Sequence, residues 1–137
     1  MGFGIIEFPD GSKYYGQTNN GEFNGTGRMV HPNGDIYQGE WKNGMAHGKG
    51  VFCDVRGSLY EGQWVNDMQH GKGVELWDFN AIKYEGDFFE GKKTGKGKFF
   101  FEGSTYQGEF VEGKFHGKGK YYFAESGKIY EGNFVDN

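Results

Sequence analysis

Short runs in which aromatic and polar residues alternate recur along the whole chain. In the clearest run, Tyr37-Gln38-Gly39-Glu40-Trp41, period-two alternation predicts a β-strand with both aromatic rings and the glycine on one face and the polar side chains on the other. Similar runs begin at Tyr60, Tyr84, Tyr106 and Tyr130, and a weaker one, with Thr18 in place of the second aromatic residue, begins at Tyr14. Their starts are 22 to 24 residues apart, and a fixed period of this size is typical of a repeat array.

Each period also contains a second strand and two turns. After Trp41, residues 42–47 form a turn-like stretch, residues 48–52 form a second strand, and a further turn around residues 56–58 leads into the next repeat. The turns between repeats include Pro9-Asp10-Gly11 and Pro32-Asn33-Gly34, in which proline presets φ and glycine accepts a left-handed conformation. No segment has helical periodicity, so we predict an all-β, elongated, single-layer antiparallel array of β-hairpins.

A register follows if residues 42–47 are the loop. Tyr37 then faces Phe52, Gly39 faces Gly50, and Trp41 faces Gly48, so that large residues meet a glycine or another ring. On the opposite face the same register predicts pairs of opposite charge, namely Glu40 with Lys49, Glu85 with Lys98, Asp87 with Lys96, and Glu109 with Lys118. A slip by one residue would exchange the two faces and lose this agreement.

The predicted array therefore has two unlike faces. Besides the two aromatic positions of each run, the aromatic face receives Met29, Phe52, Phe99 and Tyr121 from the second strands. The other face is mainly charged and amide side chains, with apolar residues near the turns between repeats at Val30, Cys53, Leu76, Phe100 and Tyr122.

We divide the chain into a half repeat (2–13), five full repeats and a second half repeat (130–137). The full repeats are 14–36, 37–59, 60–83, 84–105 and 106–129. About twelve strands spaced ~4.8 Å apart would give an array on the order of 55 Å long. Neither end contains a recognisable capping unit, so we expect a fragment of a longer array, end-to-end or edge self-association, or edges covered by a partner.

Composition narrows the class of protein. The chain has 27 glycines and 19% aromatic residues, which suggests a thin sheet with rings lying over glycines. The net charge of −4 argues against nucleic acid as a partner. Cys53 is the only cysteine, which excludes an internal disulfide and is compatible with a reducing cytosol. We expect no signal peptide in the first ten residues and no membrane-spanning segment, because there is no long apolar run.

The pattern Tyr-x-Gly-x-Trp/Phe-x-x-Gly-x-x-x-Gly-x-Gly resembles the MORN (membrane occupation and recognition nexus) repeat. The match is clearest in residues 37–50 and 106–119 and covers essentially the whole chain. The chain departs from the pattern at Thr18, at Asp67 in place of a mid-loop glycine, at Glu75 in place of an apolar residue, and at Asn80 and Ala81 in place of a turn glycine.

The resemblance implies a twisted, elongated antiparallel array with a groove on its aromatic face. MORN arrays occur in ciliary radial spoke heads, protist cytoskeletal scaffolds, junction-forming membrane proteins, plant lipid kinases and a histone methyltransferase. Chemistry in the last two resides in a separate catalytic domain. The resemblance thus implies a non-catalytic protein scaffold, with a cytoskeletal or motor-associated partner, in the cytoplasm, cytoskeleton or cilium.

The chain contains histidines and carboxylates, but their spacing does not fit a metal site or a catalytic site. His47, His70 and His116 lie one repeat apart, roughly 9–10 Å, whereas two zinc ligands must lie within about 4 Å of each other. Most carboxylates lie on the solvated face opposite lysines, not facing each other across a cleft. We expect no catalytic residues, no metal and no cofactor.

Two surfaces remain as candidate binding sites. The first is the aromatic groove, because a large exposed aromatic patch usually marks a partner site; its candidate residues are Tyr37, Trp41, Phe52, Tyr60, Trp64, Glu75, Tyr84, Phe88, Tyr106 and Phe110. Within it, Glu75 would either receive a basic partner residue or lie at a solvated rim. The second would contact anionic phospholipids through Lys92, Lys93, Lys96, Lys98, Lys114, Lys118 and Lys120. The alternatives to a protein scaffold are thus a peripheral membrane adaptor and the targeting module of a larger enzyme.

Overall fold

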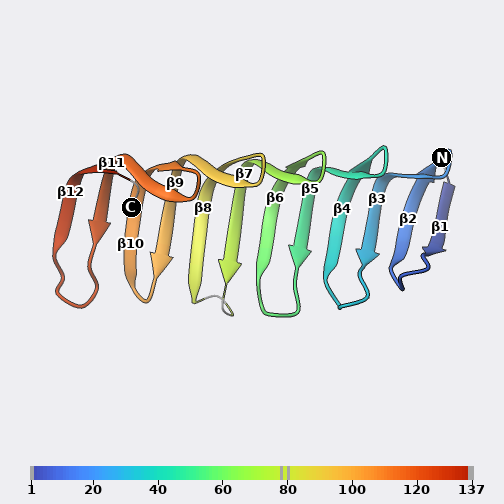
Figure 1. Ribbon diagram of the computed structural model, residues 1–137, viewed down its shortest axis with the longest axis horizontal. Coiled ribbons are helices and arrows are strands. Elements are labelled where there is room, and N and C mark those ends of the chain that lie inside the picture. The colour runs from blue at the N-terminus through green and yellow to red at the C-terminus, as the bar shows by residue number, and fades with distance from the viewer. Residues whose placement is uncertain (1, 78, 80, 136–137) are drawn as a thin grey trace.

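The computed structural model describes residues 2–77, 79 and 81–135. Over these residues the chain forms one antiparallel sheet of twelve strands, which lie side by side in chain order (Figure 1). The strands are β1 (Gly2–Glu7), β2 (Lys13–Asn19), β3 (Glu22–Val30), β4 (Ile36–Lys42), β5 (Met45–Cys53), β6 (Leu59–Val65), β7 (Met68–Trp77), β8 (Ile82–Phe89), β9 (Lys92–Phe101), β10 (Ser104–Val111), β11 (Lys114–Tyr122) and β12 (Ile129–Phe134). The predicted all-β hairpin array is confirmed. The described residues contain no helix that could cross a membrane. Asn80 lies outside them.

The turn inside each repeat is shorter than predicted. Strand β4 ends at Lys42 and β5 begins at Met45, so the connection is Asn43-Gly44 alone. Both residues have positive φ, 52° and 82°, which defines the type I′ turn that matches the twist of a hairpin. The predicted loop over residues 42–47 is therefore wrong. At the equivalent turn Asp67 replaces glycine with a φ of 70°, and its Oδ1 accepts a 2.7 Å hydrogen bond from the Ala46 backbone N–H.

A β-bulge follows each of these turns, so part of the predicted register is wrong. Tyr37 pairs with Phe52 and Gly39 with Gly50, as predicted, but Trp41 pairs with Ala46 and not with Gly48. Residues 47–49 of β5 thus oppose Glu40 alone, and the φ of 99° at Gly48 allows the chain to bend there. The same shift occurs in the four other hairpins of this kind.

The bulge also changes what the carboxylates of the polar face do. Glu40 Oε1 accepts a 2.6 Å hydrogen bond from the Lys49 backbone N–H rather than pairing with its ammonium group. The carboxylates of Asp87 and Glu109 accept the equivalent backbone N–H bonds of Lys96 and Lys118, both at 3.0 Å. Glu85 lies opposite Lys98 in the register, as predicted, but its ion pair is with Lys83, and Asp87 contacts Lys72. Among the ion pairs of the described residues, none joins the partners of the four predicted charge pairs. The second polar position of the motif serves to bind the backbone N–H that the bulge frees.

The motif tyrosines explain the glycine content. The rings of the first five motif tyrosines lie over the glycines of their own strand and the next. All six motif tyrosine hydroxyls donate to the backbone carbonyl three residues on. These six bonds are 2.6 to 3.0 Å long and join Tyr14 to Gln17, Tyr37 to Glu40, Tyr60 to Gln63, Tyr84 to Asp87, Tyr106 to Glu109 and Tyr130 to Asn133. A side chain at these glycines would occupy the space of the ring.

The core of the array is the aromatic face. Its buried residues are Tyr14, Met29, Tyr37, Trp41, Ala46, Tyr60, Trp64, Tyr84, Phe88, Tyr106 and Phe110. The register also confirms that Val30, Cys53 and Leu76 lie on the opposite face, where they form an apolar row with Ile36 and Leu59. The sheet therefore buries its rings on one side and carries most of its charge on the other.

Candidate functional site

The motif aromatics form one continuous column along the sheet. Each second ring packs edge-to-face on the tyrosine of its own repeat and on that of the preceding repeat; for Trp64 the centroid distances are 5.0 Å to Tyr60 and 5.2 Å to Tyr37. The indole N–H groups of Trp41 and Trp64 donate to the carbonyls of Gly27 and Gly50 at 3.0 and 3.1 Å. Eight of the ten predicted groove residues belong to this column and are at most 8% exposed. They form the floor of the groove, and most of its accessible surface comes from other side chains.

A second row of side chains covers this column and is half-buried. Phe52, predicted for the groove, lies in this row with Phe8, Phe23, Trp77, Phe99, Phe115 and Tyr121. Phe23 and Phe115 were missed by the sequence analysis because their position was assigned to a loop. The Asn20-Gly21 dipeptide, a strong signal for a two-residue hairpin turn, could have placed Phe23 on a strand, and the repeat period would extend this to Phe115.

In the first and last full repeats, a phenylalanine lies against the face of the motif tyrosine. Phe23 stacks on Tyr14 with centroids 4.0 Å apart and planes at 13°, and Phe115 stacks on Tyr106 at 3.9 Å and 8°. The equivalent position in every full repeat is the residue paired with the second ring of the motif, or with Thr18 in the first repeat. It is occupied by Phe23, Ala46, Gln69, Lys93 and Phe115. We call this position the cover. It is aromatic in the first and last full repeats and differs in the three between them.

The short cover at Ala46 leaves a hollow of about 470 Å³ on the aromatic face. The hollow is lined by apolar and aromatic side chains, with polar groups at its rim; the lining residues are Phe23, Met29, His31, Tyr37, Trp41, Gly44, Ala46, Phe52, Trp64, Asp67 and Gln69. A concave apolar site with a few polar groups is the usual form of a binding site for a side chain or small ligand.

Glu75 lies among the rings of the groove, where its partner is Lys93 of the same chain. The two side chains are only 17% and 20% exposed, and Lys93 Nζ lies 2.8 Å from Glu75 Oε1. The contact does not have hydrogen-bond geometry, so we treat it as a charge contact. Lys93 Nζ also lies 4.5 Å from the centroid of Trp77 and 5.6 Å from that of Tyr84, which are cation–π distances. Lys93, one of the seven lysines considered for lipid contact, therefore lies on the aromatic face.

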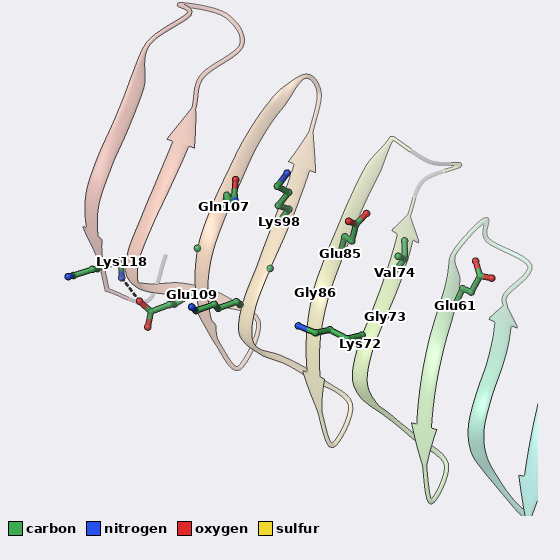
Figure 2. A pocket seen from close by; sticks show the side chains of 13 residues that line it. Glu61, Lys72, Gly73, Val74, Glu85, Gly86, Lys98, Gln107, Glu109 and Lys118 are labelled. Atoms are coloured by element: carbon green, nitrogen blue, oxygen red, sulfur yellow. Dashed lines mark hydrogen bonds between the residues drawn. The ribbon is translucent and has the colours of Figure 1, made fainter.

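The polar face carries an open hollow of about 930 Å³ (Figure 2). Its glycine floor separates two rows of side chains, with Glu61, Val74, Glu85, Lys98 and Gln107 in one row and Lys72, Lys96, Glu109 and Lys118 in the other. Lys114 and Lys120 are exposed, and Lys92 pairs with Glu112 at 3.3 Å. Acidic and basic groups therefore alternate on this face instead of forming a region of uniform positive charge.

The histidines do not converge. His70 packs against Phe89 with centroids 5.3 Å apart, whereas the Nδ1 atoms of His47 and His116 are buried in their own repeats. No group of three or more His, Cys, Asp or Glu side chains suited to a metal ion occurs in the part of the chain that the structure describes.

Burial of the motif phenols predicts sensitivity to alkali. Burial raises the pKa of Tyr60 from 10.0 to about 12, and it also raises those of Tyr37 and Tyr84. Since the folded pKa lies above the unfolded one, this stabilisation is complete below pH 10 and is lost as the pH rises towards 12. We expect the shifted pKa of Tyr60 alone to reduce the free energy of unfolding by about 1.4 kcal/mol when the pH is raised to 11. Phenolate absorbance and circular dichroism, recorded together, should change in one cooperative step for these rings; their ionisation in an intact sheet would contradict the prediction.

The fold and the groove define a β-hairpin repeat array. A sequence model of the MORN repeat matches residues 1–13, 14–36, 37–58, 60–78, 84–105 and 106–128, and the chain belongs to the MORN repeat family. MORN repeats are non-catalytic modules of protein or membrane interaction. A search of curated proteins gives no match to the chain.

Proposed function

We propose that this protein is a non-catalytic scaffold that holds a helical or extended segment of another protein along its aromatic face. The observation that carries the proposal is the apolar hollow of about 470 Å³ between Phe23 and Trp64. A single-layer sheet has no second layer to cover this face, and the half-buried row of Phe52, Trp77 and Phe99 continues it along the array. The known use of MORN arrays in cytoskeletal and ciliary assemblies supports a cytoplasmic setting with a partner of that kind.

The charge pattern supports a protein partner over an anionic membrane. Attraction to an anionic surface grows with the number of uncompensated basic residues that reach it. On the polar face, Glu61, Glu85 and Glu109 lie in the same hollow as Lys72, Lys96 and Lys118, and Asp87 contacts Lys72 directly. Much of the positive potential of the lysines is therefore cancelled within the face.

The test must change the groove without breaking the core. Trp41 and Trp64 are unsuitable because they are buried and bonded to backbone carbonyls. We would replace the half-buried Phe52 and Phe99 together by serine and compare the variant with wild type by cross-linking mass spectrometry in native extract. We expect the yield of cross-links to the partners of the wild-type protein to be at least tenfold lower for the variant.

The matched control replaces two exposed apolar residues outside the groove, Val55 and Phe89, which are 61% and 54% exposed. Val55→Ser/Phe89→Ser should retain the partners, and circular dichroism should show that both variants keep the sheet. Equal cross-linking by all three proteins would contradict groove binding. If the proteins also float with anionic vesicles at physiological salt, the membrane-adaptor alternative would be favoured.

A further inference from the structure

We propose that the hollow above Ala46 is a specificity pocket for one phenylalanine side chain of the partner protein, which stacks on the ring of Tyr37. This inference rests on the proposed function and specifies what the groove recognises. It derives from a comparison of the repeats with one another, because the chain itself contains phenylalanines in the equivalent place.

The internal examples are Phe23 and Phe115. Both are covers that lie nearly parallel to a motif tyrosine, at 4.0 Å over Tyr14 and 3.9 Å over Tyr106. Offset stacking of this kind contributes about 0.5–1.5 kcal/mol beyond the burial of apolar area. At Tyr37 the cover is Ala46, whose methyl group does not extend over the ring. The hollow lies where a stacked ring would be.

The surroundings of Tyr37 are compatible with a stacked ring. At Tyr106, the face covered by Phe115 coexists with edge contacts from Phe110 at 5.1 Å and Phe134 at 5.0 Å. Tyr37 has the matching edge contacts, from Trp41 at 4.9 Å and Trp64 at 5.2 Å. Although the indoles are larger than phenyl rings, both line the hollow and leave it open.

The other two central repeats do not offer the same pocket. Their covers, Gln69 and Lys93, are long side chains, whereas Ala46 is short. Lys93 is held in its charge contact with Glu75. A single pocket for one ring would fix the register of a bound segment along an otherwise repetitive groove.

The lining selects for an uncharged ring. Met29, Phe52 and the two indoles supply an apolar wall, and burying an unpaired charge against it would be costly. At the rim, Asp67 is already bonded through Oδ1 to the Ala46 backbone N–H. The phenyl group of phenylalanine matches this wall in shape and polarity, as Phe23 and Phe115 do in their repeats.

The first experiment detects the pocket directly with toluene, the phenylalanine side chain as a free molecule. The chain has three alanines, so selective ¹³C labelling of alanine methyl groups gives one signal at the pocket, from Ala46, and two reference signals, from Ala81 and Ala124. We expect toluene to shift the Ala46 signal saturably through the ring current and to leave the references unchanged. No shift of Ala46, or equal shifts of all three signals, would overturn the pocket.

The second experiment uses peptides selected from a phage-displayed library on immobilised wild-type protein. Ala46→Phe supplies the missing ring from within the chain, so it should fill the pocket, retain the fold and weaken peptides that depend on a phenylalanine by at least tenfold. Ala81→Phe adds the same ring at an exposed site and should not weaken them. Replacing the phenylalanine of the peptide by alanine should cost as much affinity as Ala46→Phe.

The outcomes separate this inference from the proposed function. Peptides that lose affinity with Phe52→Ser/Phe99→Ser but not with Ala46→Phe would overturn the pocket and leave groove binding intact. If no selected peptide is sensitive to any groove substitution, groove binding itself is wrong. If wild-type protein self-associates and Ala46→Phe abolishes this association, the occupant is a second copy of the chain and the assignment to a different protein is overturned.

Discussion

Gly97→Ala is expected to lower the free energy of unfolding by about 3 kcal/mol, the upper end of the usual cost of overpacking a core. A Cβ atom at Gly97 would lie 2.6 Å from the hydroxyl oxygen of Tyr84 and 2.7 Å from two of its ring carbons. Tyr84 is fully buried, its hydroxyl donates to the Asp87 carbonyl, and Phe88 and Phe110 pack on its ring. The ring therefore cannot move without disturbing two repeats. Urea denaturation followed by tryptophan fluorescence measures the loss.

Gly4→Ala is the matched control, because Gly4 belongs to the same row of glycines that crosses the sheet, where it pairs with Gly16. A Cβ atom at Gly4 would meet nothing within 4 Å, so we expect a change within about 0.5 kcal/mol. Similar losses for the two variants would mean that glycine is needed for backbone reasons and not to make room for the tyrosine ring.

The repeat period and the alternation within it were enough to predict the face of nearly every motif ring. The register derived from the loop over residues 42–47 correctly placed Gly39 opposite Gly50 and Tyr37 opposite Phe52, because these pairs lie beyond the bulge. The bulge was not predicted, because a six-residue loop and a two-residue turn followed by extra residues on one strand have the same length in the sequence. Preferring the type I′ signal of Asn43-Gly44 would have corrected this.

That single difference hid most of the candidate site. In the predicted loop, Ala46, Lys93 and Phe115 had no assigned face, so neither the cover position nor the hollow could be inferred. Glu75 was recognised as an irregularity of the aromatic face, but its partner was not, since Lys93 reaches that face only when the strand begins directly after the turn. Contacts between repeats depend on strand boundaries more than on composition.

Lys93→Met is expected to lower the free energy of unfolding by about 2 kcal/mol. Methionine keeps an apolar stem against Trp77 and Tyr84 but leaves the Glu75 carboxylate, only 17% exposed, without its counter-charge. Removing one partner of a fully buried ion pair costs about 3–5 kcal/mol, and the residual solvent access here reduces that figure. Lys92→Met is the control: the neighbouring lysine also pairs with a glutamate, Glu112, but its side chain is 61% exposed, so we expect less than about 0.5 kcal/mol.

The double variant Glu75→Met/Lys93→Met should recover the stability of the wild type or exceed it, because apolar pairs often replace buried ion pairs without loss. The chain provides a precedent, since Met29 occupies the position of Glu75 two repeats earlier. A double variant as unstable as the sum of the two single variants would show that the two side chains are not energetically coupled, and it would contradict the prediction. The recovery we expect would instead mean that the ion pair adds no stability relative to an apolar pair. Its presence in the middle of the groove would then be explained better by recognition of a partner than by folding.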